Sequence, residues 1–260
     1  NIMEKLTMGS QRDALKARLT AALDAGIDGI TLSAGLHLES LCLMKEHARF
    51  RDAKIGIIVS SVRALKIFMR SAHRVDRAPD YIIVEGPLAG GHLGFGMDWR
   101  DFDLTQIVKE VVTFLADQKL DIPVIAAGGV FSGGDAVSMI NCGASAVQVA
   151  TRFTVTRESG LPPKAKQAYF ESQEEDVLVT DVSPTGYPLR MLSNSPCLSS
   201  SIKPNCEQYG YMLDKDGKCS YLDAYAKAVD EAAGKKLAII KEKICLCHHF
   251  GRYSSMPRGQ

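Results

Sequence analysis

The sequence predicts an α/β fold, either a TIM (β/α)8 barrel or a doubly wound sheet, in which parallel strands alternate with helices. Its 260 residues are enough for one large domain with a full core. Hydrophobic residues make up 46% and charged residues 23%, as in an ordinary globular protein. Short apolar runs bounded by Gly, Ser or Thr alternate with longer amphipathic stretches. Strands that are apolar on both faces belong to parallel sheets covered by helices.

Six strands are expected, and amphipathic sequence such as residues 103–117 follows them. The first is read as the end of a strand at Asn1-Ile2-Met3, and the others are 29–35, 54–61, 81–86, 122–129 and 144–151. A barrel needs eight βα units. We therefore expect a TIM barrel that lacks its first two units, with residues 1–160 carrying units three to eight.

Residues 161–260 are expected to form a C-terminal extension packed on the barrel. A helix begins after a proline pair in 161–172, and extended segments follow at 176–180 and 183–190. A cysteine-bearing tail then contains an amphipathic helix at 221–243. This helix either packs on its own domain or forms a homodimer contact.

Charge and hydropathy exclude several kinds of partner. The 31 basic and 30 acidic residues nearly cancel, so no broad attraction for nucleic acid or anionic lipid is expected. No apolar run reaches the roughly 18 residues of a membrane span, and Asn1 does not open a signal peptide. The sequence thus favours a cytoplasmic protein with a small-molecule substrate.

Two glycine-bearing turns are candidates for a phosphate site. Gly128-Gly129 follows one apolar run and precedes a helix, and Ala150-Thr151 follows the next run. Glycine lets the backbone approach an anion, and a following helix supplies N–H groups. Two such turns one βα unit apart match the phosphate site of many barrels. The alternative is that these glycines serve only a positive φ.

The run EGPLAGGHLGFG, residues 85–96, is the most informative stretch. Its glycines surround His92, and Phe95 adds a flat apolar face, so the loop is expected to fold over a planar ligand and bring His92 to its reactive edge. The alternative is an ordinary surface or core histidine. A second strand end carries Gly35 and His37, and His37 is either a pocket-lining residue or a plain loop residue.

Four motifs in this order resemble the nitronate monooxygenase family, formerly called 2-nitropropane dioxygenases, which also includes flavin-dependent enoyl-acyl-carrier-protein reductases. They are Asn1-Ile2-Met3, the EGPLAGGH run, IPVIAAGGV and the end at Gln148 to Thr151. The segment SPTGYPLR, 183–190, is similar to a further family segment. The resemblance covers about residues 1–190, and Asn1 matches an asparagine that the family carries after its third strand.

By this resemblance the fold is a TIM barrel that binds FMN without covalent attachment. His92 matches the active-site histidine, and Gly35, His37 and Phe95 are expected to line the substrate pocket. The expected cofactor-binding residues are Asn1, Glu85, Gly90, Gly91, Gly128, Gly129, Gln148, Val149, Ala150 and Thr151. Many members carry Gln at the position of Glu85, so a carboxyl near the flavin is expected to alter the redox potential or the substrate.

The resemblance implies flavin-dependent oxidation of a nitronate or nitroalkane with oxygen as the acceptor. One alternative is reduction of an enoyl thioester or quinone by NAD(P)H. A more distant alternative is a barrel that uses its glycine-rich turns for a phosphorylated substrate, without flavin.

The seven cysteines raise an alternative of another class, a metal-binding or non-catalytic module. Cys42 and Cys142 are read as small buried residues. The other five crowd into the last quarter, and His248 and His249 stand near them, but the spacings are irregular and no Cys-x-x-Cys pair occurs. Free thiols are therefore the preferred interpretation, and the candidate ligands for a metal are Cys206, Cys219, Cys245 and Cys247.

Overall fold

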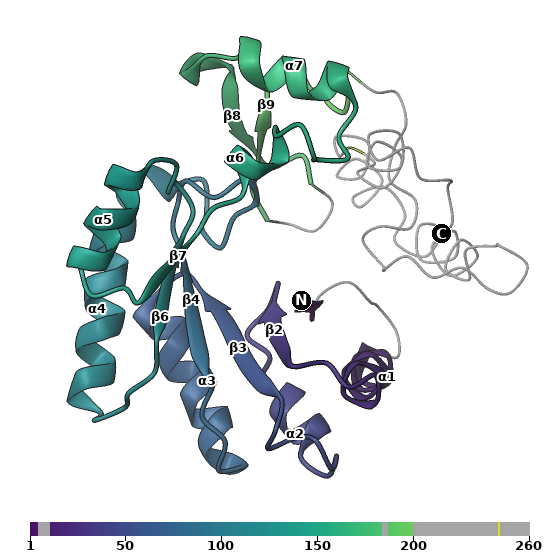
Figure 1. Cartoon of the computed structure of the whole chain (residues 1–260), viewed down its shortest axis with the longest axis vertical. Helices are drawn as coiled ribbons and strands as arrows, with labels where there is room; N and C mark the ends of the chain where they lie inside the picture. The colour runs from purple at the N-terminus through teal and green to yellow at the C-terminus, as the bar shows by residue number, and fades with distance from the viewer. Residues whose placement is uncertain (5–10, 184–186, 200–243, 245–260) are drawn as a thin grey trace, which may run out of the picture. The chain divides into compact units, whose positions relative to one another are not determined.

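A computed structural model of the chain describes residues 1–4, 11–183, 187–199 and 244 (Figure 1). The chain divides into two compact units. The first unit holds residues 1–89 and 98–149, and the second holds 90–97 with the described residues from Ala150 onward. The predicted boundary at residue 160 falls inside the second unit. The predicted helix at 221–243 lies outside the described residues.

A six-stranded parallel sheet forms the centre of the first unit. All six predicted strands are present in it, in the order β1-β2-β3-β4-β6-β7, with parallel pairing throughout. Their bounds are β1 (Ile2–Met3), β2 (Gly29–Ser33), β3 (Lys54–Val59), β4 (Tyr81–Glu85), β6 (Val124–Ala127) and β7 (Ala146–Gln148). Neighbours in the sheet follow one another along the chain, as in an α/β barrel. The predicted α/β class is confirmed.

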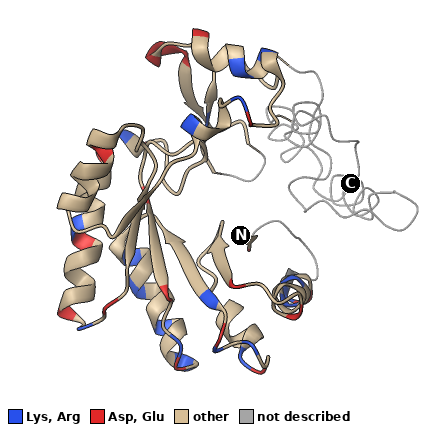
Figure 2. Ribbon diagram, in the orientation of Figure 1, with Lys and Arg blue, Asp and Glu red and all other residues tan. Residues whose placement is uncertain are grey.

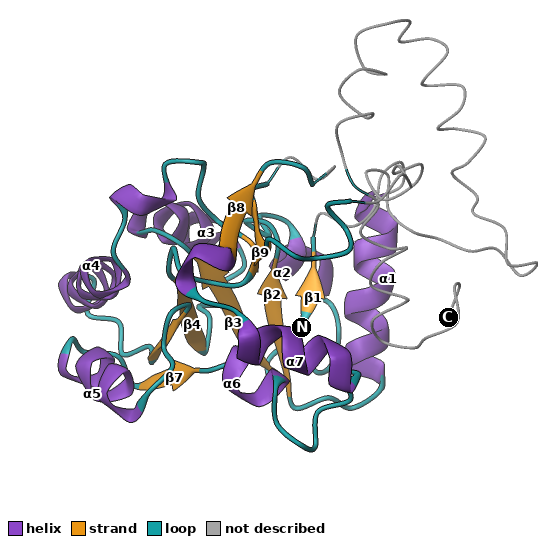
Figure 3. Cartoon of the chain, turned by 90° about the horizontal axis from the view of Figure 1, so that it is seen from above, coloured by secondary structure: helices purple, strands orange, loops and turns teal. Residues whose placement is uncertain are grey.

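The helices of this unit follow the strands in turn, and α3, α4 and α5 lie along one face of the sheet (Figures 1 and 3). Ser61 accepts a hydrogen bond from the Ala64 N–H at the start of α3, and Asp103 accepts one from the Gln106 N–H at the start of α4. The helices are α1 (Gln11–Asp24), α2 (Ser40–Met44), α3 (Val62–Arg74), the 3-10 turn η1 (Trp99–Asp101), α4 (Leu104–Asp117) and α5 (Gly133–Asn141).

Alternation along the strands gives the sheet two unlike faces. The face toward the helices is aliphatic and buried, and it comprises Ile30, Leu32, Ile55, Ile57, Ile82, Val84, Val124 and Ala126. The opposite side, here called the inner face, carries the aliphatic side chains Ile58, Ile83 and Ile125 and also polar and small ones, among them Thr31, Ser33, Tyr81, Glu85, Ala127 and Gln148. The Thr31 and Tyr81 hydroxyls are 2.6 Å apart, and Tyr81 reaches across Gly56. Polar chemistry is therefore concentrated on the inner face.

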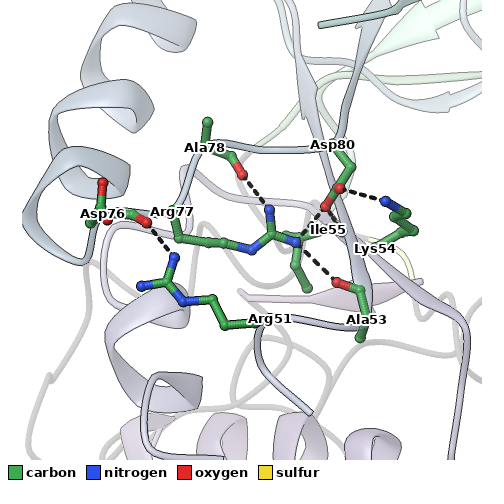
Figure 4. Close-up of polar contacts among 8 residues, drawn as sticks. All are labelled: Arg51, Ala53, Lys54, Ile55, Asp76, Arg77, Ala78 and Asp80. Atoms are coloured by element: carbon green, nitrogen blue, oxygen red, sulfur yellow. Dashed lines mark hydrogen bonds and ion pairs between the residues drawn. The ribbon is translucent and has the colours of Figure 1, made fainter.

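Figure 4 shows the polar cluster that closes the amino end of this sheet. The Asp80 carboxylate accepts hydrogen bonds from the Ile55 N–H at 2.8 Å and from the Arg77 guanidinium at 2.6 Å. It also forms an ion pair with Lys54 at 3.1 Å. Arg77 donates in addition to the Ala53 carbonyl at 3.0 Å. The loop after α3 is thereby tied to the first residues of β3.

The second unit contains a three-stranded antiparallel sheet in the order β5-β9-β8. The predicted helix at 161–172 and the predicted extended segment at 176–180 are present as α7 and β8. Of the predicted segment 183–190, residues 184–186 lie outside the described residues and 189–190 belong to β9. The strand β5, which carries His92, was not predicted. Lys166 donates to the carbonyls of Thr156 and Ser159, both at 2.7 Å. The elements are β5 (Gly91–His92), α6 (Thr151–Thr154), α7 (Pro163–Glu171), the 3-10 turn η2 (Glu174–Asp176), β8 (Val177–Thr180) and β9 (Leu189–Leu192).

Basic and acidic side chains are both spread over the helices and loops of the first unit, whereas acidic ones gather around η2 in the second (Figure 2). This mixture agrees with the near balance of charge in the sequence. Among the described residues, no helix combines the length and the apolar character needed to cross a membrane.

Candidate functional site

Three strand ends form a row on the inner face of the first unit. Glu85 lies opposite Ala127 in the pairing of β4 with β6, and Ala127 lies opposite Gln148 in the pairing of β6 with β7. Neighbouring strands are about 4.8 Å apart, so the Cα atoms of Glu85 and Gln148 are roughly 10 Å apart. The small Ala127 leaves room between two hydrogen-bonding side chains. The structure thus brings two of the predicted cofactor residues to one edge, next to Gly128.

The Glu85 carboxyl is the most unusual polar group of this row. In the described part of the chain, no side chain or backbone group forms a hydrogen bond or ion pair with it. Burial raises its pKa above the ordinary value of 4.5. A carboxyl that keeps its proton more readily can donate a hydrogen bond as well as accept one. Glu85 is thus available to a ligand that offers both kinds of partner.

Gly128 and Gly129 have positive φ angles of 86° and 102°. A Cβ on Gly128 would meet the Gly86 carbonyl at 2.9 Å, and one on Gly129 would meet Leu88 at 2.9 Å. Backbone conformation and close packing against the loop after β4 therefore require both glycines. Their contact with a phosphate stays a prediction.

Asp135 forms hydrogen bonds with the loop that leads into α5. Asp135 accepts hydrogen bonds from the Phe131 N–H at 3.1 Å and the Ser132 N–H at 2.7 Å, and the Ser132 hydroxyl accepts from the Asp135 N–H. These bonds form a capping box and hold the pKa of Asp135 below its ordinary value. A carboxylate of the chain itself thus occupies the Phe131 and Ser132 amides. Anion binding by the following helix start stays a prediction.

A groove of about 590 Å³ lies between the starts of α4 and α5. Trp99, Phe102, Met139 and the glycine pair at 128–129 contribute to its wall. The sequence did not predict it, because its wall combines three segments that show no common motif.

Asn1, just before β1, and the end of β2 form a second polar group on the first unit. The Ser33 hydroxyl donates a hydrogen bond to Asn1 Oδ1. His37 is fully buried, with Nε2 at 2.6 Å from the Ser33 carbonyl oxygen and Nδ1 at 2.8 Å from the Ser40 hydroxyl. Since a carbonyl only accepts, Nε2 carries the proton and Nδ1 accepts from Ser40. Burial lowers the pKa of His37, so the ring is neutral.

His37 therefore makes internal contacts at this strand end, and its role in lining a pocket stays a prediction. Gly35 lies in the same loop, where a Cβ would collide with the side chain of Glu4. The Glu4 carboxylate also accepts a hydrogen bond from the His37 N–H at 3.0 Å. Close packing explains the glycine here.

His92 belongs to the second unit. It lies opposite Leu189 in the antiparallel pairing of β5 with β9, and its Nε2 is 2.7 Å from the hydroxyl of the buried Ser183. The ring keeps exposed surface, yet burial of its remainder lowers its pKa below 6.5. A neutral imidazole held on one side can accept a proton on the other. Sequence reasoning missed Ser183, although it belongs to the family-like segment 183–190.

The other predicted residues of the second unit surround this strand or begin the unit. In the described structure, a Cβ at Gly90 or Gly91 would meet nothing within 4 Å, and Gly91 has a φ of 76°. Phe95 is buried. Val149 ends the first unit, and Ala150 and Thr151 are exposed at the start of the second. Their contacts with a cofactor stay predictions.

No metal centre is visible in the described ranges, since no group of three or more His, Cys, Asp or Glu side chains is placed to hold an ion. The candidate ligands Cys206, Cys219, Cys245 and Cys247 lie outside the described residues. Cys42 is exposed and Cys142 is half-buried, contrary to the expectation that both are buried, whereas Cys197 is buried.

Known proteins are similar to this chain in sequence and in structure. A probable nitronate monooxygenase of Staphylococcus saprophyticus is 30% identical over 75% of the chain and 52% of the relative. A protein of Mycobacterium tuberculosis named as an octahydro-indene-carboxyl-CoA dehydrogenase is 31% identical over 66% of the chain and 46% of its own length. The chain thus spans about half the length of these relatives.

Solved structures agree with the barrel-type fold. FabK from Thermotoga maritima superposes with a TM-score of 0.57 at 27% identity, covering 75% of this chain and 54% of FabK. A nitroalkane oxidase from Streptomyces ansochromogenes superposes with a TM-score of 0.56 at 25% identity, covering 70% of this chain and 50% of the oxidase. The family model described as nitronate monooxygenase matches residues 7–238. The chain therefore belongs to the nitronate monooxygenase family.

Proposed function

We propose that the protein is an FMN-dependent oxidoreductase that oxidises a nitronate or nitroalkane, with oxygen as the electron acceptor. The observation that carries this proposal is the row of Glu85, Ala127 and Gln148 at the carboxyl ends of parallel strands, where α/β folds place their sites. Membership of the nitronate monooxygenase family supports the reaction class.

The residues of the first unit fit an isoalloxazine ring. Its pyrimidine part alternates N–H and C=O groups, and the Glu85 carboxyl has no partner of its own in the described structure. The Gln148 and Asn1 amides supply further donors and acceptors from two other strands. We propose that these three side chains hold the flavin, with Gly129 near its phosphate; cofactor binding by Ala150 and Thr151 stays a prediction from the sequence. When bound, FMN supplies the electron transfer.

His92 is proposed as the base that takes the α-proton of a neutral nitroalkane. Nε2 is within hydrogen-bond distance of the Ser183 hydroxyl. In the proposed tautomer Nε2–H donates to Ser183, and Nδ1 keeps its lone pair and receives the proton. The lowered pKa keeps the ring neutral near pH 7, which a base requires. Ser183 still accepts from Nε2–H after the ring becomes charged, so the ring need not turn during proton transfer.

A second candidate is the NAD(P)H-dependent reduction of an enoyl thioester or quinone. The similarity to the carboxyl-CoA dehydrogenase of Mycobacterium tuberculosis favours it, because that relative is named for a thioester substrate. Both candidate functions use the same proposed flavin-binding residues, and they differ in the compound that reduces the flavin.

The test uses the full-length protein reconstituted with FMN. Mixing with a nitronate in air, and separately with NADH or NADPH without oxygen, shows which donor reduces the flavin. His92→Ala should bind FMN, lose turnover of a neutral nitroalkane and keep most turnover of its nitronate, which needs no base. His73→Ala, an exposed histidine on α3, is the matched control. Normal turnover of the neutral nitroalkane by His92→Ala would show that His92 is not the base.

A small-molecule substrate, the absence of nucleic-acid and membrane partners, a homodimer contact and a cytoplasmic location stay predictions from the sequence.

A further inference from the structure

A strained loop follows β2 on the first unit. Ala34 and His37, neither of them glycine, have φ angles of 52° and 50°. Such conformations persist only where surrounding contacts enforce them. Here the enforcing contacts are internal: the His37 ring donates to the Ser33 carbonyl at 2.6 Å, and the His37 N–H donates to Glu4 at 3.0 Å. The loop is therefore held from both of its sides.

These contacts fix the residue at the end of β2. The Ser33 carbonyl accepts from both the Glu4 N–H at 3.0 Å and the His37 ring. Ser33 is itself buried, and its hydroxyl donates to Asn1 Oδ1. With its oxygen held in this way, the exposed Asn1 amide has an NH2 group without a partner among the described residues.

From this geometry we infer that Ser33 is a positioning residue, which turns Asn1 so that its NH2 group donates to an acceptor atom of the bound flavin, and that buried His37 holds Ser33 in place. This inference rests on the proposed function, because the acceptor belongs to FMN. Asn1 was expected to contact the flavin, but neither Ser33 nor His37 had been assigned a part in its orientation.

A double-mutant cycle on FMN affinity tests the inference in the full-length protein, with flavin fluorescence as the readout. Ser33→Ala should weaken FMN binding about three- to tenfold, the effect of one lost hydrogen bond. In an Asn1→Ala background the same change should alter affinity by less than about twofold. Ser33→Thr, which keeps the hydroxyl, should restore affinity. Asn1→Asp, which replaces the NH2 group by oxygen, should bind FMN as weakly as Asn1→Ala.

Ser40→Ala is the matched control, since it removes the other hydrogen bond of the same buried ring without contacting Asn1. It should lower the melting temperature and leave FMN affinity unchanged. Equal losses of affinity from Ser33→Ala in both backgrounds would show a purely structural role and overturn the inference. If the unmutated protein binds no FMN, the proposed function fails instead, and the flavin-positioning role fails with it.

Discussion

Replacing Asp80 by Ala tests the cluster at the amino end of the sheet. The change removes the acceptor for the Ile55 N–H and the Arg77 guanidinium (Figure 4), and Arg77 is 13% exposed while Asp80 is 18% exposed. Hydrogen bonds to charged groups contribute about 1.5–3 kcal/mol each, so two give about 3–6 kcal/mol. The Lys54 side chain is 68% exposed, and its ion pair adds less than about 1 kcal/mol.

Thermal and urea unfolding measure this loss, which corresponds to a drop in Tm of roughly 10 °C in a unit of this size. Lys54→Ala is the control and should cost less than about 1 kcal/mol. Burial alone would raise the pKa of Asp80, but hydrogen bonds from Ile55, Arg77 and Lys54 outweigh it and lower the pKa. The contribution is therefore present above the ordinary pKa of 3.8 and lost as pH falls through the folded value. A loss in Asp80→Ala no larger than in Lys54→Ala would refute the reasoning.

Three further outcomes are expected. Ser183→Ala should lower kcat for a neutral nitroalkane about two- to tenfold and shift the acid limb of its pH profile. Ser183→Thr should keep the kcat and the pH profile of the unmutated protein. An unchanged pH profile in Ser183→Ala would show that the contact with His92 does not contribute to turnover. Glu85→Gln should raise Tm at about pH 7 but not at about pH 4. A carboxyl whose pKa is raised in the folded state lowers the stability only above its ordinary pKa of 4.5. Equal changes in Tm at both pH values would contradict this. The lowered pKa of buried His37 should make urea stability fall as pH drops below 6.5, where the unfolded chain takes up the proton, and this fall should persist in His92→Gln.

Much of the fold was predictable because its signals are local. The strands around Ile57 and Val84 are apolar on both faces, and a helical pattern follows each of them. The strand at Gly91–His92 gave no such signal: it has two residues, and its partner strand begins at Leu189. Its pairing depends on contacts far apart in the sequence, which no periodicity reveals.

The candidate site divides in the same way. The strand-end positions of Glu85 and Gln148 followed from their place after apolar runs, and parallel pairing brought them to one edge. The partners of the histidines, Ser40 and Ser183, could not be chosen among the many serines without coordinates. The glycine pair at 128–129 was recognised, but its packing against the loop after β4 needs the structure.

The pairing of β5 with β9 sets an order of events during synthesis. His92 lies opposite Leu189, so its strand has no partner until the chain has been made almost a hundred residues further. The parallel strands from β1 to β7 all lie before residue 149, and can begin to pair while this segment waits. The cost of closing so long a loop makes this contact late in folding. A chain that ends before Leu189 thus contains all the strands of the parallel sheet, whereas the segment with His92 lacks its partner strand.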